Sequence, residues 1–192
     1  MKSDSGRAFP ATIETERLVL REWREDDADA LFHYASDERV GPAAGWPPHD
    51  SVASSEEVIR NVLARPGVYA VTVRGSDEPI GSVGLQIDKD ISDELELGYW
   101  IAMPFWGRGY AGEACEALLR HAFETLGEYS VRCGAFEENS QSRRVQEKLG
   151  FAHSHTVPGK LFPLIDARKD LVVTRLTRDD WQRRQPEFAW SG

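Results

Sequence analysis

The sequence predicts a mixed α/β domain, of the α+β kind, in which helices pack on a central sheet. Two observations lead to this class. Short apolar segments rich in β-branched and aromatic residues recur along the 192 residues, and the segment 111–126 carries apolar residues at the spacing of an amphipathic helix. In chain order we expect one strand, two helices, three strands, and then helix, strand, helix and strand. A chain of this length fits one domain with its own core.

The first third of the chain predicts one strand followed by two helices. Residues 18–23 are apolar and β-prone, and residues 28–35 repeat apolar side chains at helical spacing. The segment 41–50, GPAAGWPPHD, holds three prolines and two glycines. Because proline does not continue a helix, we expect an exposed loop there. A second helix is expected over 55–63, ended by Pro66.

The rest of the chain alternates between β-prone and helical patterns. Turn residues and glycines separate these segments, as is typical of strand and helix ends. Thr177 is a residue type that caps helices, and a short terminal helix is expected after it. The expected strands are 68–74, 79–87, 94–101, 130–136 and 170–176, and the expected helices are 111–126 and 139–149.

Composition excludes several classes of protein. The net charge of −9 argues against nucleic-acid binding, which requires a basic face. No apolar run approaches the roughly 20 residues that cross a bilayer, and the first ten residues lack the apolar core of a secretory signal, so we expect a cytoplasmic protein without a membrane span. Cys115 and Cys133 are too few for a disulfide framework. His153 and His155 lack partners at metal-ligand spacing, and no metal is expected.

The segment 94–112, ELELGYWIAMPFWGRGYAG, carries the strongest chemical signal in the chain. A strand runs through Pro104 into a turn with Gly107 and Gly109, and the turn opens the long helix. Glycines let the backbone approach a ligand, and the unpaired N–H groups of a helix start attract anions such as pyrophosphate. Glycines serve ordinary turns more often than phosphates, so this fragment alone is weak. It lacks the third glycine of a dinucleotide fingerprint and the Gly-Lys-Ser/Thr of a nucleotide P-loop.

With Gly109 and Ala111 at its small positions, the segment resembles the acetyl-CoA-binding motif of the GNAT superfamily, Gln/Arg-x-x-Gly-x-Gly/Ala. The closest resemblance is to the RimJ/RimL-like ribosomal-protein acetyltransferase branch. Three further segments match it in order: Thr15 to Arg21 (TERLVLR), Glu96 to Trp100 (ELGYW), and Asn139-x-x-Ser142 leading to Lys148 to Phe151 (KLGF).

This resemblance implies a mixed, mostly antiparallel sheet of about six to seven strands. Helices would cover both faces, and two splayed strands would form the acetyl-CoA cleft. The matches span one acyl-CoA N-acyltransferase domain over 12–178, between a flexible segment at 1–11 and a C-terminal tail at 179–192. The oligomeric state is left open between monomer and homodimer.

The implied activity is transfer of an acetyl group from acetyl-CoA to a primary amine by direct attack through a tetrahedral intermediate. The acceptor would be a protein N-terminus or a small-molecule amine. Many relatives carry a tyrosine seven residues after the asparagine as general acid, but this chain has Gln146. That departure favours a second reading, an acyl-CoA-binding sensor without turnover. A third reading is a nucleotide-binding domain of another fold.

Backbone N–H groups of the turn and of the preceding strand would bind the cofactor, so Trp106 in place of the usual Gln or Arg weakens the match without cancelling it. Arg108 can add a charge-assisted contact. An exposed helical arginine explains Arg143 equally well. The implied cofactor-binding residues are Ile101, Ala102, Trp106, Gly107, Arg108, Gly109, Tyr110, Ala111, Gly112, Asn139 and Arg143.

Strand alternation places Glu94, Glu96 and Trp100 on one face. Two carboxylates on a cleft face repel each other, and repulsion with burial raises a carboxyl pKa toward the value a general base requires. The resemblance favours Glu96 as this base, against an ordinary polar sheet face. Ser142 would donate to the departing thiolate.

Asn139 would bond the pantetheine or amine region, although asparagine also caps helices regardless of function. The expected catalytic residues are therefore Glu96, Ser142 and Asn139. For substrate we expect Trp46, Glu94 and Trp100. Trp46 would line the acceptor pocket, or would fold back onto the core, as tryptophans often do.

Overall fold

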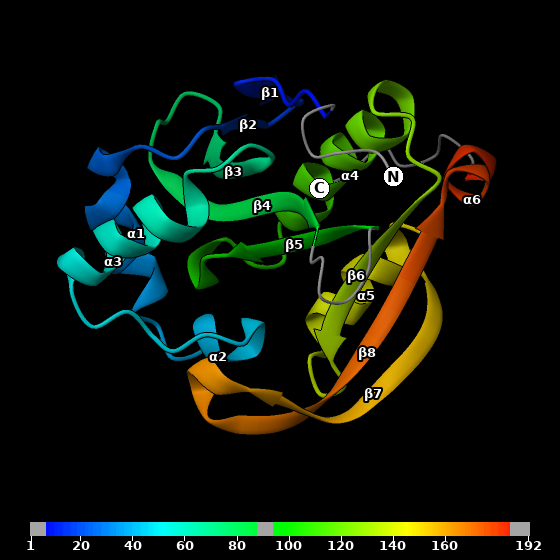
Figure 1. Cartoon of the computed structure of the whole chain (residues 1–192). Helices are drawn as coiled ribbons and strands as arrows, with labels where there is room; N and C mark the ends of the chain where they lie inside the picture. The colour runs from blue at the N-terminus through cyan, green and yellow to red at the C-terminus, as the bar shows by residue number, and fades with distance from the viewer. Residues whose placement is uncertain (1–6, 88–93, 185–192) are drawn as a thin grey trace.

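The computed structural model of the chain describes residues 7–87 and 94–184 (Figure 1). Its centre is one eight-stranded sheet with the order β1-β2-β3-β4-β5-β6-β8-β7. The strands are β1 (Thr12–Glu14), β2 (Leu18–Arg21), β3 (Val68–Val73), β4 (Pro79–Ile87), β5 (Leu95–Ile101), β6 (Ser130–Phe136), β7 (Ala152–Phe162) and β8 (Ala167–Thr177).

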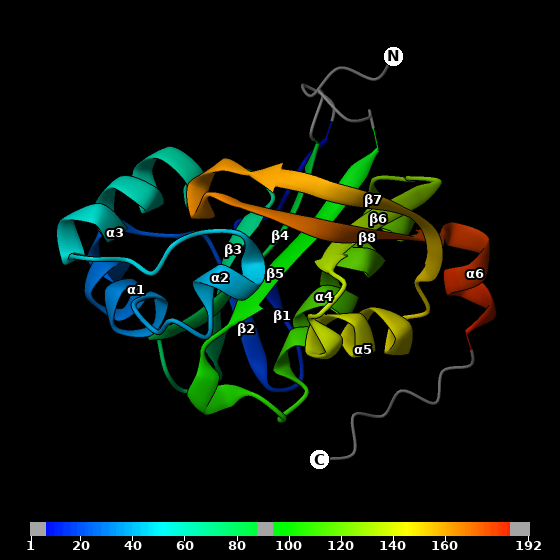
Figure 2. The same ribbon diagram turned by 90° about the horizontal axis from the view of Figure 1, so that it is seen from below.

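Helices cover both faces of this sheet (Figure 2). One face carries α4 and α5 over the larger core cluster, and the other carries α1 and α3 over a smaller one. The helices are α1 (Ala28–Ala35), α2 (Gly41–Ala44), α3 (Val52–Val58), α4 (Tyr110–Arg120), α5 (Ser140–Lys148) and α6 (Arg178–Arg183). Single π turns extend α3 over Ile59–Leu63 and α4 over His121–Thr125. Within the described ranges, no helix is long and apolar enough to cross a membrane.

All strand pairs are antiparallel except β5 and β6, which run parallel. These two strands pair only where Leu95–Leu97 lie beside Val131–Cys133, and beyond that point they separate. The predicted class is therefore confirmed: a mixed, mostly antiparallel sheet with helices on both faces and a splay between two central strands. The separation leaves room for a ligand in the middle of the sheet.

The sheet has more strands than the sequence pattern predicted. β1 is only three residues long, and β7 is an edge strand whose first five residues are all exposed. A strand without a buried face shows no alternation of apolar and polar residues, so its pattern resembles that of a loop. The ladder between β7 and β8 also shifts register between Val157 and Lys160, around Pro158 and Gly159.

The predicted loop over 41–50 was partly wrong, because α2 occupies its first four residues. Pro42 lies in the first turn of α2, where a helix does not need the missing N–H. Gly41 is buried, and a Cβ there would lie 2.4 Å from the Trp46 ring. The tryptophan therefore packs back onto the helix that precedes it, and α2 is held close to the sheet.

Both ends of the described chain contact the body of the domain. Phe9 packs against the larger core, and Arg7 forms an ion pair with Glu128 at 2.9 Å. At the other end, the Trp181 ring of α6 lies 5.5 Å from the Phe123 ring. The boundaries of the predicted N-terminal segment and C-terminal tail stay predictions.

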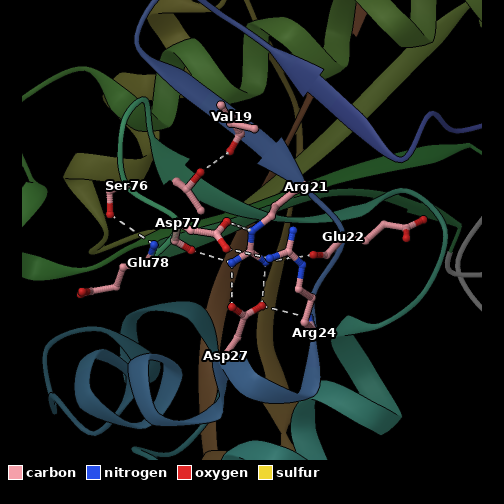
Figure 3. A network of polar contacts seen from close by, with 9 residues as sticks. Val19, Arg21, Glu22, Arg24, Asp27, Ser76, Asp77 and Glu78 are labelled. Atoms are coloured by element: carbon pink, nitrogen blue, oxygen red, sulfur yellow. Dashed lines mark hydrogen bonds and ion pairs between the residues drawn. The ribbon is translucent and has the colours of Figure 1, made fainter.

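A buried arginine ties three segments of the N-terminal half together (Figure 3). Arg21 of β2 donates to both carboxylate oxygens of Asp27 at 2.7 and 2.8 Å, and to Asp77 in the β3–β4 turn at 2.7 Å. The hydrogen bonds with Asp27 raise the pKa of Arg21, so the guanidinium keeps its charge. This network fixes the start of α1 against the sheet edge.

Candidate active site

A cavity of about 570 Å³ opens between the separated ends of β5 and β6. The start of α4 and one face of α5 close one end, and α2 with the β7–β8 hairpin frames the other. The structure brings most of the predicted site residues to this cavity. They are Glu96, Trp100, Ile101, Trp106, Gly107, Gly109, Tyr110, Ala111, Gly112, Asn139 and Ser142.

The glycine turn presents the start of α4 to the cavity. Gly107 and Gly109 have φ values of 75° and 78°, in the left-handed region that favours glycine. Gly109 is the N-cap residue, and no side chain caps the helix. A Cβ on Gly107 would meet no atom within 4 Å, so the turn borders open space. Unpaired amides beside open space form a place for an anion.

Trp106 closes this turn onto β5. Its indole Nε1 donates to the carbonyl oxygen of Ile101 at 2.6 Å, and its ring packs on the larger core. The side chain therefore fixes the loop that leads into the glycine turn. This contact gives a structural reason for a tryptophan at a position where the resembling motif has Gln or Arg.

The backbone amides at the end of β5 point alternately toward β4 and toward the gap beside β6. The Ala102 N–H donates to the Ile80 carbonyl at 2.8 Å, so of the expected cofactor-binding amides this one already has a backbone partner. Successive residues of a strand direct their backbone groups to opposite sides, and the Ile101 carbonyl meets Trp106 on the side of the splay. The Ile101 N–H therefore faces the same side, toward the cavity.

Glu113 anchors the first turn of α4 to the connection between β1 and β2. Its carboxylate accepts hydrogen bonds from the Thr15 hydroxyl at 2.6 Å, the Arg17 backbone N–H at 2.8 Å and the Arg17 side chain at 2.7 Å. Burial raises the pKa of this carboxyl, but the hydrogen bonds outweigh burial and leave its pKa below the ordinary value. The Arg17 guanidinium also lies over the Tyr110 ring, which lines the cavity.

Replacing Glu113 by glutamine is expected to lower the free energy of unfolding by about 2 kcal/mol at pH 7, because it removes the charge of a buried carboxylate whose partner Arg17 is still 29% exposed to solvent. A carboxyl with a lowered folded pKa stabilises above its unfolded pKa, and this stabilisation is lost as pH falls through the folded value. The difference in unfolding free energy between wild type and Glu113→Gln should therefore become smaller as the pH falls below 4.5, the ordinary pKa of a glutamate. Urea unfolding at pH 7 and pH 3.5 measures it, with the exposed Glu124→Gln as control. An equal gap at both pH values contradicts this assignment.

Glu96 and Glu94 do not interact as the sequence suggested. Glu96, with 38% of its side chain exposed, pairs with the buried Arg132 of β6, while Glu94 pairs with Arg175 of β8 at 2.9 Å. Each carboxylate thus pairs with an arginine of its own. The Glu96 Oε1 atom lies 3.8 Å from where a Cβ on Gly134 would be, facing the cavity. Glu94 lies outside the lining.

Asn139 joins α5 to α2. Its side-chain oxygen accepts from the Ser142 N–H at 3.0 Å, which is a helix cap, and its amide donates to the Ala43 carbonyl at 3.1 Å. The structural role is therefore present, and Asn139 also lines the cavity. Ser142 follows one turn later and places its hydroxyl 2.8 Å from the Tyr99 hydroxyl.

Three further predicted residues lie outside the cavity lining. Arg108 sits over the Phe105 ring at 5.5 Å, Arg143 donates to the Glu137 carbonyl at 3.3 Å, and Trp46 packs edge-on against Trp100 at 5.8 Å. Trp46 belongs with the smaller core cluster, as the alternative reading of this residue proposed.

Sequence reasoning missed several residues that do line the cavity. Gln141, Arg144, Val145 and Lys148 repeat at i, i+3, i+4 and i+7 along α5, so they share one helix face, and all four line the cavity. That spacing could have placed Arg144 and Lys148 at the cavity ahead of Arg143. Lys160 of the unpredicted β7 also lines it.

Comparisons with known proteins agree with this geometry. A family model described as an acetyltransferase (GNAT) domain matches residues 17–152. The chain is 30% identical to the uncharacterized N-acetyltransferase p20 of Bacillus licheniformis, over 73% of this chain and 82% of that protein. It is 25% identical to the ribosomal-protein-serine acetyltransferase of Escherichia coli, over 71% and 80% of the two chains. A probable GNAT-family acetyltransferase from Chromobacterium violaceum has a similar fold, with a TM-score of 0.79, 21% identity, and coverage of 92% and 91%.

Proposed function

The chain belongs to the acetyltransferase (GNAT) family and is an acyl-CoA-dependent N-acetyltransferase, and from this premise we propose that its donor is acetyl-CoA bound between β5 and β6. One observation supports this most directly. The cavity where β5 and β6 separate is bordered by the glycine turn and by the start of α4, which no side chain caps. Glu96 and Ser142 line this cavity as well.

The diphosphate of coenzyme A would bind the amides that follow Gly107 and Gly109. Open space beside Gly107 fits such a group, and a helix start favours negative charge. Arg144 and Lys148, on the cavity face of α5, supply positive side chains for further phosphate oxygens. Trp106 supports the turn from behind through its bond to Ile101.

Acetyl transfer then needs a neutral amine, a donor to the oxyanion and a route for the departing proton. Glu96 takes the amine proton, directly or through one water, while Arg132 holds its second oxygen. The Ile101 N–H donates to the carbonyl oxygen of the acetyl group. As the C–N bond forms and the C–S bond breaks, the electron pair stays on sulfur, where Ser142 donates a hydrogen bond.

The acceptor proposed is the N-terminal amine of a protein. This rests on the resemblance to the RimJ/RimL-like branch and on the similarity to the Escherichia coli ribosomal-protein-serine acetyltransferase. We take the cavity end framed by α2 and the β7–β8 hairpin as the acceptor end, and Phe162 lines it. Leu161 and Leu164 of the same hairpin are exposed beside Phe162. Exposed apolar side chains suit contact with a protein. A small amine is the alternative acceptor.

The test is to incubate the purified chain with acetyl-CoA and a panel of amines, and to follow thiol release and product mass. The panel contains peptides with free N-termini, amino acids and polyamines. We expect thiol release that depends on peptide amines. Binding of acetyl-CoA without turnover on any amine would favour the sensor reading instead, and absence of binding would overturn the proposed donor.

A further inference from the structure

A buried polar cluster lies directly behind the cavity, where β5, α5 and β8 meet. It consists of Tyr99, Ser142, Gln146 and Thr174. Gln146 is 1% exposed and Thr174 is 8% exposed, while Tyr99 and Ser142 reach the cavity lining. Buried polar groups are costly unless their donors and acceptors are satisfied, so the direction of each hydrogen bond can be worked out.

The orientation of the Gln146 amide is fixed by its neighbours. Its nitrogen lies 3.4 Å from the Gly134 carbonyl oxygen, which only accepts, and 3.3 Å from the Ser142 hydroxyl. The Thr174 hydroxyl has one proton and two acceptors beside it, the Gln146 oxygen at 2.8 Å and the Cys133 carbonyl at 3.2 Å, and the shorter contact assigns the proton to Gln146. The reversed amide would place two carbonyl oxygens against each other. Gln146 is therefore a donor toward Ser142.

The Ser142 hydroxyl proton is then available to the Tyr99 oxygen or to a ligand. Tyr99 has one proton and two acceptors beside it, the Ser142 backbone carbonyl at 3.0 Å and the Ser142 hydroxyl oxygen at 2.8 Å, and because Gln146 already donates to that hydroxyl oxygen we assign the proton to the carbonyl. The Ser142 oxygen accepts from Gln146, so its own proton points to the Tyr99 oxygen, 2.8 Å away, or to an acceptor in the cavity. Burial has the largest effect on the Tyr99 phenol and raises its pKa. The phenol therefore stays protonated, and the direction of these hydrogen bonds is kept.

We propose that Tyr99, Gln146 and Thr174 are positioning residues that orient the Ser142 hydroxyl as a hydrogen-bond donor to the leaving thiolate of coenzyme A. This inference rests on the proposed function. No proton moves in this step: the C–S bond breaks, its electron pair stays on sulfur, and the thiolate takes a proton from solvent after release. A phenol from β5 and an amide from α5 thus replace the tyrosine that relatives carry at the position of Gln146.

Calorimetry with coenzyme A and desulfo-coenzyme A tests the donor without turnover. A cysteine thiol ionises near pH 8.5 and a simple alkyl thiol somewhat higher, so raising the pH from 7 to 9.5 increases the thiolate fraction of coenzyme A. In the wild type, the preference for coenzyme A over the desulfo compound is expected to grow about tenfold over this range. Ser142→Ala should reduce the growth to about twofold and Gln146→Met to about threefold. Ser140→Ala, at an exposed residue of the same helix outside the cavity lining, should match the wild type.

Kinetics separate positioning from a merely structural role. Thr174→Val should lower kcat about fivefold with an unchanged KM for acetyl-CoA, and Thr174→Ser should restore it because the hydroxyl returns. The two Thr174 variants also test the positioning role if Gln146→Met does not fold. An unchanged pH dependence in Ser142→Ala and Gln146→Met, or an equal kcat in the two Thr174 variants, overturns the inference and leaves the proposed function standing. If neither coenzyme A nor the desulfo compound binds, the proposed function itself fails.

Discussion

Replacing Glu96 by glutamine is expected to lower kcat/KM about 1,000-fold at pH 7 with a peptide acceptor, within the usual range for a general base. The loss should shrink to about tenfold at pH 9.5. An α-amino group has a pKa near 8, so at high pH the amine is already neutral and needs less help to lose its proton. Glutamine keeps an oxygen that accepts from Arg132 but loses the charge opposite this buried arginine, so thermal unfolding of Glu96→Gln is measured beside its kinetics.

The matched control is Glu116→Gln. Glu116 is also partly exposed and paired with an arginine, Arg184 at 2.9 Å, but it lies outside the cavity lining. Its kcat/KM should stay within about twofold of wild type at every pH, as expected for a pair far from the chemistry. A Glu96→Gln deficit of the same size at pH 7 and pH 9.5 would argue against a base and for a purely electrostatic or structural role.

The second large effect is expected at Gly109. Gly109→Val should weaken coenzyme A binding at least about 100-fold. A side chain in the left-handed region costs roughly 1–2 kcal/mol, more when β-branched, and the distorted turn loses hydrogen bonds to a charged ligand worth about 1.5–3 kcal/mol each. Calorimetry with coenzyme A measures the affinity, and thermal unfolding measures the cost to stability.

Gly75→Val supplies the comparison for this variant. Gly75 has a φ of 86° in the β3–β4 turn, and a Cβ there would meet no atom within 4 Å. The two variants carry similar backbone strain, but only one of them is at the cavity. We expect normal coenzyme A affinity in Gly75→Val, and an equal loss in both variants would show that strain alone, and not the ligand contact, explains the result.

The parts of the fold that the sequence predicted have a buried face. Segments such as 79–87 and 111–126 carry an apolar pattern because they pack on the core, and the structure forms β4 and α4 there. β7 has no such pattern because it is an exposed edge. The helix α2 was missed because its prolines and glycines indicate a turn, while its stability comes from contact between Gly41 and Trp46.

The site was predictable where neighbouring residues in the sequence define it. The turn at Gly107 and Gly109 is such a case, because strand, turn and helix follow one another along the chain. The Glu96 and Arg132 pair is not, since it depends on the register of two parallel strands 36 residues apart. The cluster around Gln146 was not predictable either, because it brings together residues from β5, α5 and β8.

The short pairing between β5 and β6 has a consequence for stability. Among residues 7–87 and 94–184, backbone pairing between the N-terminal half of the sheet and the strands β6, β8 and β7 is limited to Leu95–Leu97 and Val131–Cys133. Past these residues β5 and β6 share no ladder, and the two parts of the sheet are joined across the gap by the Tyr99–Ser142 hydrogen bond and by the bond from Asn139 to the Ala43 carbonyl. A linear donor bound along the gap would contact both parts of the sheet, so its binding is expected to raise the free energy of unfolding in step with its occupancy.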